Sequence, residues 1–158
     1  MTNEMDACTL ICKSIRSAGG WAHKIADPSS DFGATIQRPH DIYGALHKHA
    51  LYIEAKYRKD LGVLDLQEIA DHQFASLLGL KKQLPNAWCF IIWAVSAGRG
   101  DHRLYTFDNL EELQQRKKTR QNILKKELLG LPYLKVKKDL VVLDGTVDPF
   151  RIHHPIAD

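Results

Sequence analysis

The chain has 158 residues, a length that suits one compact domain with its own core. Its hydrophobic content of 44% and charged content of 26% are ordinary for a soluble globular protein. No apolar run reaches the length of a bilayer span, and the first residues lack the basic region of a secretion signal. These features exclude a membrane-spanning protein and lead us to expect a cytoplasmic one.

The three cysteines, Cys8, Cys12 and Cys89, cannot all pair within one chain. No matching Cys/His pair at zinc spacing accompanies them, so we expect reduced structural thiols. The net charge of +3 is mild, and the distribution of the basic residues therefore matters more than their sum.

The first predicted element is a helix over residues 4–18, which has apolar residues at helical spacing and ends at Gly19-Gly20. A short strand over residues 21–25 follows. Residues 27–33 are dense in turn-forming residues, so we expect a loop there.

A hairpin pattern comes next. Its first arm begins at His40-Asp41, its tip is the polar stretch 46–49, and its second arm runs from Ala50 to Tyr57. In a strand, side chains alternate between faces with period two. Glu54 and Lys56 therefore share one face of the second arm, opposite its apolar residues.

If the hairpin is centred between His47 and Lys48, Asp41 falls directly opposite Glu54. Directly opposed like charges destabilise a sheet. A divalent cation between the two carboxylates reverses that effect, because hard cations take carboxylate oxygens. Lys56 then points into the same pocket, and the pattern predicts a metal-dependent phosphodiesterase site.

Glu-x-Lys by itself occurs in many chains, and a solvated strand face with a Glu/Lys pair is the alternative explanation. Three features favour the site: the apolar residues flanking Glu54, the matching Asp41 on the preceding strand, and the register that opposes them.

The next predicted element is a long helix that begins with a capping-box pattern at Asp65–Glu68 and runs to about Leu84, before Pro85. One polar residue, Gln73, interrupts its apolar stripe, whose members are Leu66, Ala70, Gln73, Leu77, Leu80 and Leu84. Gln73 is either a core residue bonded to backbone or a side chain directed into the site.

The remaining elements complete an α/β pattern. Residues 87–95 are nearly all apolar, as in a central strand, and 103–107 alternate as a further strand. A second long helix is expected from Asp108 to Gly130, and a last hairpin over 134–136 and 140–144. We predict one domain over residues 1–158, with a central mixed β-sheet flanked by helices.

The second long helix carries a basic run, with six Lys or Arg residues between Arg116 and Lys126. Such a run is either a solvated helix face or a patch that binds the phosphate backbone of DNA. Beside a phosphodiesterase site the DNA-binding interpretation is favoured, and it assigns Lys117, Lys118 and Arg120 to DNA contact. Lys24 and Arg38 offer another path for DNA.

Several stretches resemble the PD-(D/E)XK nuclease superfamily, and more narrowly the RecU-type Holliday junction resolvases. They cover roughly residues 20 to 110 and include His23-Lys24 with Pro28, Asp41–Gly44, Tyr52–Lys56, Asp71–Gln73 and Trp88–Ile92. The resemblance implies a restriction-endonuclease-like core. It also implies Asp41 and Glu54 as metal ligands, Lys56 as the catalytic lysine and Gln73 as a further site residue.

Members of that family act as homodimers on four-way DNA junctions with Mg²⁺, and Mn²⁺ is expected to substitute. The superfamily sometimes adds a carboxylate from the first helix, for which Glu4 and Asp6 are the candidates. The apolar strands, Trp21, Trp88 and Trp93, and the last hairpin are further grounds for expecting a dimer.

The chain departs from the family at His40, where Thr is common, and in residues 26–40, which are shorter than the family's projecting stalk. A minimal, phage-encoded relative fits that shortening, in a bacterial cell or a phage-infected host. The shortening bears on junction recognition more than on chemistry. The alternatives are a restriction- or repair-type nuclease for duplex or flapped DNA and a DNA-binding module without catalysis.

Overall fold

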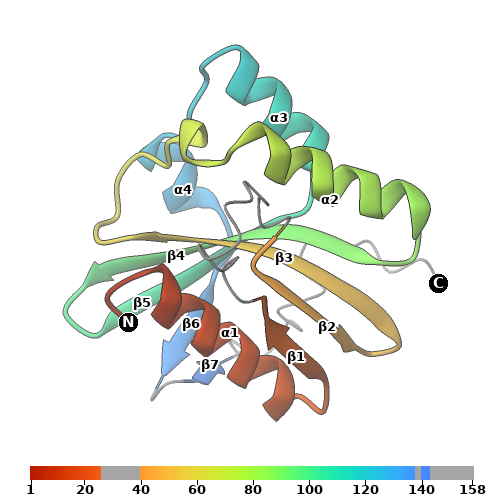
Figure 1. Cartoon of the computed structure of the whole chain (residues 1–158). Coiled ribbons are helices and arrows are strands. Elements are labelled where there is room, and N and C mark those ends of the chain that lie inside the picture. The colour runs from red at the N-terminus through yellow and green to blue at the C-terminus, as the bar shows by residue number, and fades with distance from the viewer. Residues whose placement is uncertain (26–39, 138–139, 143–158) are drawn as a thin grey trace, which may run out of the picture.

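The computed structural model describes residues 1–25, 40–137 and 140–142 (Figure 1). These residues form a sheet of seven strands in the order β1 to β7. The strands are β1 (Trp21–Lys24), β2 (Ile42–Leu46), β3 (His49–Arg58), β4 (Trp88–Gly98), β5 (Asp101–Phe107), β6 (Leu134–Lys137) and β7 (Leu140–Val142). The helices are α1 (Glu4–Ser17), the 3₁₀ turn η2 (Leu66–Glu68), α2 (Asp71–Gln83), α3 (Leu110–Lys118) and α4 (Lys125–Gly130).

The sheet is mixed, because β3 and β4 are parallel while every other neighbouring pair is antiparallel. η2 and α2 lie on the connection between the two parallel strands, as a parallel pair requires. The predicted fold class, one α/β unit with a central mixed sheet flanked by helices, is confirmed. The domain prediction for the full range 1–158 includes residues outside the described ranges.

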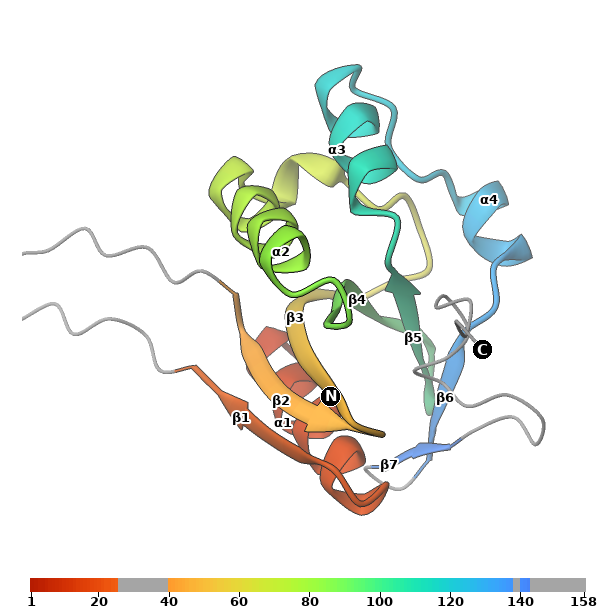
Figure 2. The same ribbon diagram turned by 90° about the vertical axis from the view of Figure 1, so that its right-hand side faces the viewer.

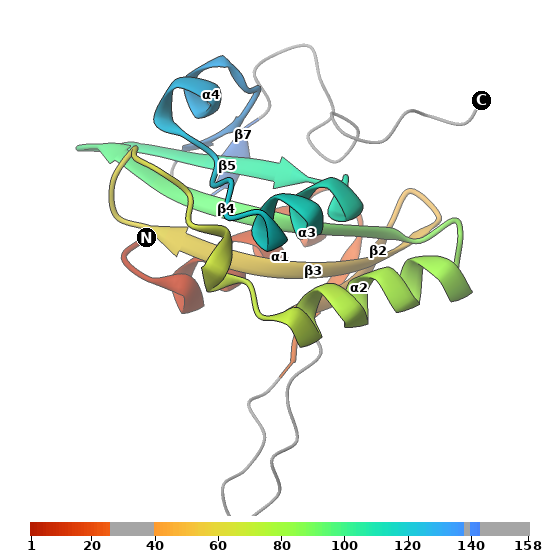
Figure 3. The same ribbon diagram turned by 90° about the horizontal axis from the view of Figure 1, so that it is seen from above.

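The sheet separates α1 on one face from α2 and α3 on the other (Figures 1 and 3), and an apolar core lies on each side. On one face α1 packs on alternate residues of the central strands, among them Ile53 and Ala55. On the other face lie α2, α3 and α4, with Phe74 and Leu77 of α2 packed against Ile91 and other residues of β4. β4 contributes to both cores and is buried along most of its length, as predicted for a central strand.

The predicted hairpin register is confirmed. β2 and β3 pair as Ile42 with Ile53 and Tyr43 with Tyr52, which centres the hairpin between His47 and Lys48. These two tip residues have φ of 50° and 66°, as the tight turns that suit a twisted hairpin require. Asp41 immediately precedes β2, and its backbone N–H donates to the carbonyl of Ile53 (3.0 Å).

The predicted long helix from Asp65 to Leu84 is wrong in its first part. Asp65 caps only the turn η2, and the backbone of Ala70 is extended (φ −69°, ψ 151°) before α2 begins. The side chain of Gln73 accepts a hydrogen bond from the Ala70 N–H (2.9 Å) and so caps α2 at this later point. Leu66 therefore lies in η2, outside α2, and Leu84, at the other end of the predicted stripe, is 44% exposed.

The second predicted helix is also divided, into α3 and α4. Arg120 takes a left-handed conformation (φ 55°), which ends the first helix. Ile123 then exchanges two backbone hydrogen bonds with Leu64 and is buried. Burial of Ile123 and its pairing with Leu64 thus replace the continuous helix that local periodicity favours.

Other predictions have clear outcomes. All three cysteines are buried and free, as expected. Trp88 and Trp93 are buried within the chain at 8% and 0% exposure, so these two tryptophans provide no surface for a dimer. None of the described helices has the length and apolar character needed to cross a membrane.

Candidate metal centre

Strand β3 presents Glu54 and Lys56 on the sheet face that carries α2, and the β2–β3 register brings Asp41 beside them. The three side chains are buried, with exposures of 0% for Glu54, 8% for Lys56 and 1% for Asp41. The Asp41 carboxylate accepts a hydrogen bond from the backbone N–H of Ala55 (2.8 Å), which fixes its position next to β3. The opposition of Asp41 and Glu54 expected from the sequence is therefore present.

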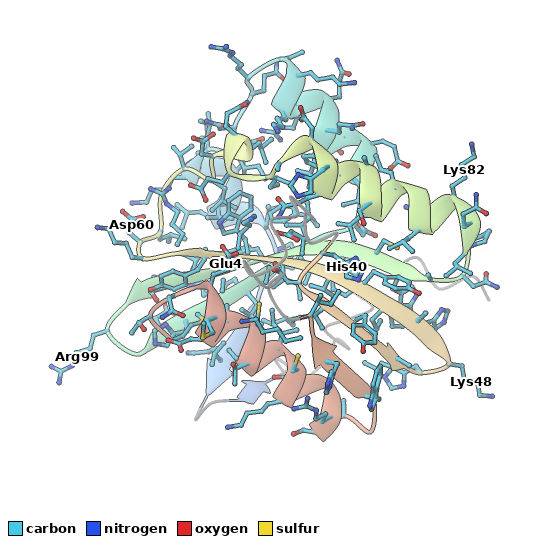
Figure 4. The ribbon with its side chains drawn as sticks, viewed as in Figure 1. Glu4, His40, Lys48, Asp60, Lys82 and Arg99 are labelled. Atoms are coloured by element: carbon cyan, nitrogen blue, oxygen red, sulfur yellow. The ribbon has the colours of Figure 1, made fainter. Side chains whose placement is uncertain are left out.

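Helix α1 adds a third carboxylate, that of Glu4. One oxygen from each of Glu4, Asp41 and Glu54 lies within 4.8 Å of the others. Glu4 belongs to the first turn of α1, and Figure 4 shows it toward the centre of the molecule, whereas Lys48, Lys82 and Arg99 lie at the periphery. The set therefore combines two residues of the β2–β3 hairpin with one from the distant helix α1.

Of the two acidic candidates on the first helix, the structure brings only Glu4 to the site. The Asp6 carboxylate is exposed and accepts hydrogen bonds from the backbone N–H (2.8 Å) and hydroxyl (2.7 Å) of Thr2. Both residues lie in the first helical turn, so helix position alone did not distinguish them. The packing of α1 across the sheet decides which one reaches Glu54.

Lys56 lies between carboxylates. Its Nζ is 3.0 Å from Oε1 of Glu54 and 4.0 Å from Oε1 of Glu4. Burial by itself lowers the pKa of Lys56, but Glu54 and Glu4 outweigh that effect and raise its pKa above the ordinary value. Lys56 is therefore a fixed ammonium group at the edge of the acidic cluster.

Gln73 connects α2 to the cluster. Its amide nitrogen donates a hydrogen bond to Oε1 of Glu54, while its amide oxygen accepts from Ala70. Gln73 thus bonds to the backbone and is also directed toward Glu54. Its role in catalysis stays a prediction. The hydrogen bond that caps α2 also orients the amide toward Glu54.

The electrostatics favour a bound cation. Burial, followed by the nearby Asp41, raises the pKa of Glu54 to about 8 although Lys56 acts in the opposite direction. The second oxygen of Glu54, Oε2, is buried and has no hydrogen-bond donor among the residues that the structure describes. A buried carboxylate oxygen without a donor costs free energy, and a divalent cation is the ligand that three converging carboxylates fit.

His40, the residue at which the chain departs from the family pattern, is 6% exposed. Its ring packs edge-on against that of Tyr52, with centroids 5.2 Å apart. Neither ring nitrogen has a hydrogen-bond partner among the described residues. Burial lowers the pKa of His40 more than Asp41 raises it, so the ring adds no positive charge to the site at neutral pH.

The predicted DNA-binding residues do not form one group. Lys118 and Arg120 are exposed at the end of α3. Lys117 instead donates to the carbonyl of Ile69 and pairs with Asp71 (2.8 Å), which joins α3 to the start of α2. Lys24 is half-buried in β1 on the opposite sheet face from the aromatic residues of that strand, and Arg38 lies outside the described residues.

No protein-family model matches this chain, and neither does any curated protein. Among solved structures, the chain is similar to Hjc, a Holliday junction resolvase from the archaeal hyperthermophile Archaeoglobus fulgidus. The match has a TM-score of 0.41 and 15% sequence identity, and it covers 75% of this chain and 93% of that one. At this level of identity, the function has to be inferred from the chemistry of the site.

Proposed function

We propose that this protein is a metal-dependent DNA endonuclease of the PD-(D/E)XK type that resolves four-way junctions by paired, symmetric nicks. The observation that carries the proposal is the convergence of Glu4, Asp41 and Glu54 within 4.8 Å beside the buried ammonium of Lys56. A protein that only binds DNA gains nothing from three anions facing a phosphate backbone. The resemblance of the hairpin and the His72-Gln73 pair to RecU-type resolvases supports the choice of four-way junctions.

Each residue of the site has a role in this chemistry. Glu4, Asp41 and Glu54 would hold Mg²⁺, or Mn²⁺ in its place. When bound, such an ion neutralises charge on the scissile phosphate and lowers the pKa of a coordinated water. Lys56 would orient the attacking water and stabilise the charge that develops on the phosphoryl oxygens. Gln73 holds the carboxylate of Glu54 in position.

The decisive experiment is cleavage of labelled DNA by the purified protein in Mg²⁺ and, separately, in Mn²⁺. The substrates are a four-way junction, a duplex, a flap and a single strand of shared sequence. We expect two symmetric nicks in the junction and none with the Asp41→Asn variant, whose amide oxygen still accepts from the Ala55 N–H but carries no charge.

Preferred cleavage of duplex or flap over junction would establish the restriction- or repair-type alternative. Failure of the wild-type protein to cut any of the four DNA forms with either ion would refute the nuclease proposal. Equal cleavage by Asp41→Asn would remove Asp41 from the site.

A further inference from the structure

Three aromatic side chains gather on the edge of the sheet formed by β1 and β2. The rings of Trp21 and His23 are parallel within 3° with centroids 5.7 Å apart, and Tyr43 meets both edge-on, at 5.2 Å from Trp21 and 6.1 Å from His23. We call Trp21, His23 and Tyr43 the ring cluster. Its packing holds the rings in fixed orientations, as a preformed contact surface requires.

The ring cluster lies on the same sheet face as the acidic site. His23 pairs with Tyr43 and Tyr43 pairs with Tyr52, so their side chains share a face with Asp41 and Glu54 two residues away. Ala22 and Ile42, which alternate with them, are buried on the opposite face against α1. Two residues along a strand span about 7 Å, so the cluster begins next to the candidate metal ligands.

The described residues leave this part of the sheet open. Trp21 is 52% exposed and Tyr43 is 36% exposed. Helix α2 lies over β3 and β4, while β1 and β2 extend beyond it (Figure 2). Exposed aromatic rings in contact with one another, beside a candidate catalytic site, indicate a binding surface rather than a scattered surface residue.

A second copy of the chain is a poor occupant for so small an area. A fully covered aromatic side chain buries about 150–250 Å², and the rings of the cluster are already partly covered by one another. Three such rings supply less than the roughly 800 Å² per partner of a standard protein interface. The flat faces of tryptophan, tyrosine and histidine instead suit a single nucleobase, which stacks on aromatic rings irrespective of its identity.

We propose that the ring cluster stacks against an unpaired nucleobase next to the scissile phosphate. The inference rests on the proposed nuclease function and specifies its substrate: DNA in which at least one base beside the cleavage point is free to leave the helix. In a continuous duplex, both faces of each base are covered by the neighbouring bases. No face is left for a ring of the protein to stack on. The ring cluster would therefore favour junctions and flaps, where bases open readily, over uninterrupted duplex.

Binding measured without divalent cations tests this inference independently of cleavage. Fluorescence anisotropy in EDTA gives the affinity for a junction with two unpaired nucleotides at its centre and for a duplex of equal length. We expect Trp21→Ala and Tyr43→Ala each to weaken binding to the junction by about tenfold, the scale of one lost base–aromatic stack. Affinity for the duplex should be unchanged, and Trp21→Phe should retain most of the wild-type affinity.

A junction with abasic sites in place of the two unpaired nucleotides supplies the matching change in the DNA. If the rings contact the bases, Trp21→Ala does not weaken binding to this abasic junction any further. The wild-type protein then binds the abasic junction about as weakly as Trp21→Ala binds the junction with its bases in place. Leu129→Ala, which removes an exposed apolar side chain (58%) on the distant α4, is the control and should bind like wild type. Thermal unfolding of each variant reports whether the edge of the sheet remains folded.

Equal weakening on the junction, the abasic junction and the duplex would overturn the stacking inference, as would unchanged affinity of both ring variants. A lower mass of Trp21→Ala by light scattering would assign the ring cluster to an interface between two copies instead. If the wild-type protein cuts DNA but its binding is indifferent to the unpaired bases, only this inference fails. If the wild-type protein neither binds nor cuts DNA, the proposed function fails with it.

Discussion

Glu54 is the residue on which the other groups of the candidate metal centre converge. It is fully buried, it faces Asp41 and Glu4, and it receives the side chains of Lys56 and Gln73. Burial, and then the nearby Asp41, raise the pKa of Glu54, so ionising this carboxyl group without a cation is costly. A divalent cation would supply the missing positive charge, so metal binding should stabilise the folded protein.

Glu4→Gln should weaken metal binding, because it removes the charge that α1 contributes to the site. For the wild-type protein, Mn²⁺ at 100 times its dissociation constant should add about 2.7 kcal/mol to the free energy of unfolding. The variant should need a higher Mn²⁺ concentration for the same rise in the thermal midpoint. The matched control is Asp6→Asn on the same helix turn, which should titrate like wild type; identical titrations of Glu4→Gln and wild type would exclude Glu4 as a ligand.

Asp41→Asn should leave the thermal midpoint of the metal-free protein level or slightly higher. The change removes one of the opposed anions at a buried position, and the hydrogen bond from the Ala55 N–H can persist. Thermal unfolding in EDTA measures this effect. A large drop in the midpoint would mean that the Asp41 charge stabilises the metal-free fold, which contradicts a site that needs a cation.

Lys56→Ala should slow cleavage by at least ~10²-fold, the cost of losing one group that stabilises charge in the transition state. Single-turnover cleavage at saturating Mn²⁺ separates this effect from metal affinity. Lys59→Ala, three residues further on and exposed, is the control. A rate within a few-fold of wild type would leave Lys56 with a structural role only.

Among the elements, α2 is the one that connects helix formation to the site. Its late start allows Gln73 to cap the helix with the amide oxygen and to contact Glu54 with the amide nitrogen. A continuous helix from Asp65 would have used the Ala70 N–H within the helix and left Gln73 without this cap. The break before α2 therefore positions the side chain.

Gln73→Glu separates the two roles of this residue. The new carboxylate can still accept from the Ala70 N–H, so α2 should stay capped, whereas Gln73→Ala should lose about 1 kcal/mol of stability with the cap. Both variants should lower the cleavage rate, because neither donates to Glu54. Full activity in Gln73→Glu, measured beside its unfolding free energy, would show that the contact with Glu54 is not needed.

Helix α3 divides its basic residues between structure and surface. Lys117 joins α3 to α2 through Asp71 and the Ile69 carbonyl, while Lys118 and Arg120 face solvent. The run that looks uniform in sequence therefore contains cations with different surroundings. Only the exposed ones are free to contact a phosphate backbone.

Reversing Lys118 and Arg120 to Glu should weaken binding to every DNA form and reduce the slope of log affinity against log salt by about one per lost phosphate contact. Lys13→Glu combined with Arg99→Glu changes the net charge equally at two other exposed positions and is the control. If both double variants lose affinity to the same extent, net charge explains the effect and DNA does not follow the end of α3.

For the whole molecule, we predict a homodimer with two-fold symmetry. Paired nicks across a junction need two active sites related by the symmetry of the substrate, and an isologous dimer provides them. Light scattering at micromolar protein without DNA should give a mass near twice the 18.0 kDa of one chain. A monomer that stays monomeric on junction DNA would contradict the prediction and favour a simpler repair nuclease.

The sequence by itself determined the features that depend on local alternation and local turns. The β2–β3 hairpin, its register and the opposition of Asp41 and Glu54 follow from period-two patterning around a polar tip, and the structure contains them. The buried central strand β4 follows from its uninterrupted apolar run. These elements are specified by residues close in the chain, so they can be predicted from the sequence without knowledge of the tertiary structure.

Only the tertiary structure decided what depends on distant segments. Packing of α1 brings Glu4, and not Asp6, to the acidic cluster. Pairing of Ile123 with Leu64 divides the second predicted helix. The ion pair with Asp71 holds Lys117 against α2, so it is not one of the exposed basic residues. In each case the local pattern allowed more than one arrangement. Burial and hydrogen bonds between residues far apart in sequence selected one of them, because such contacts exist only once the chain has folded.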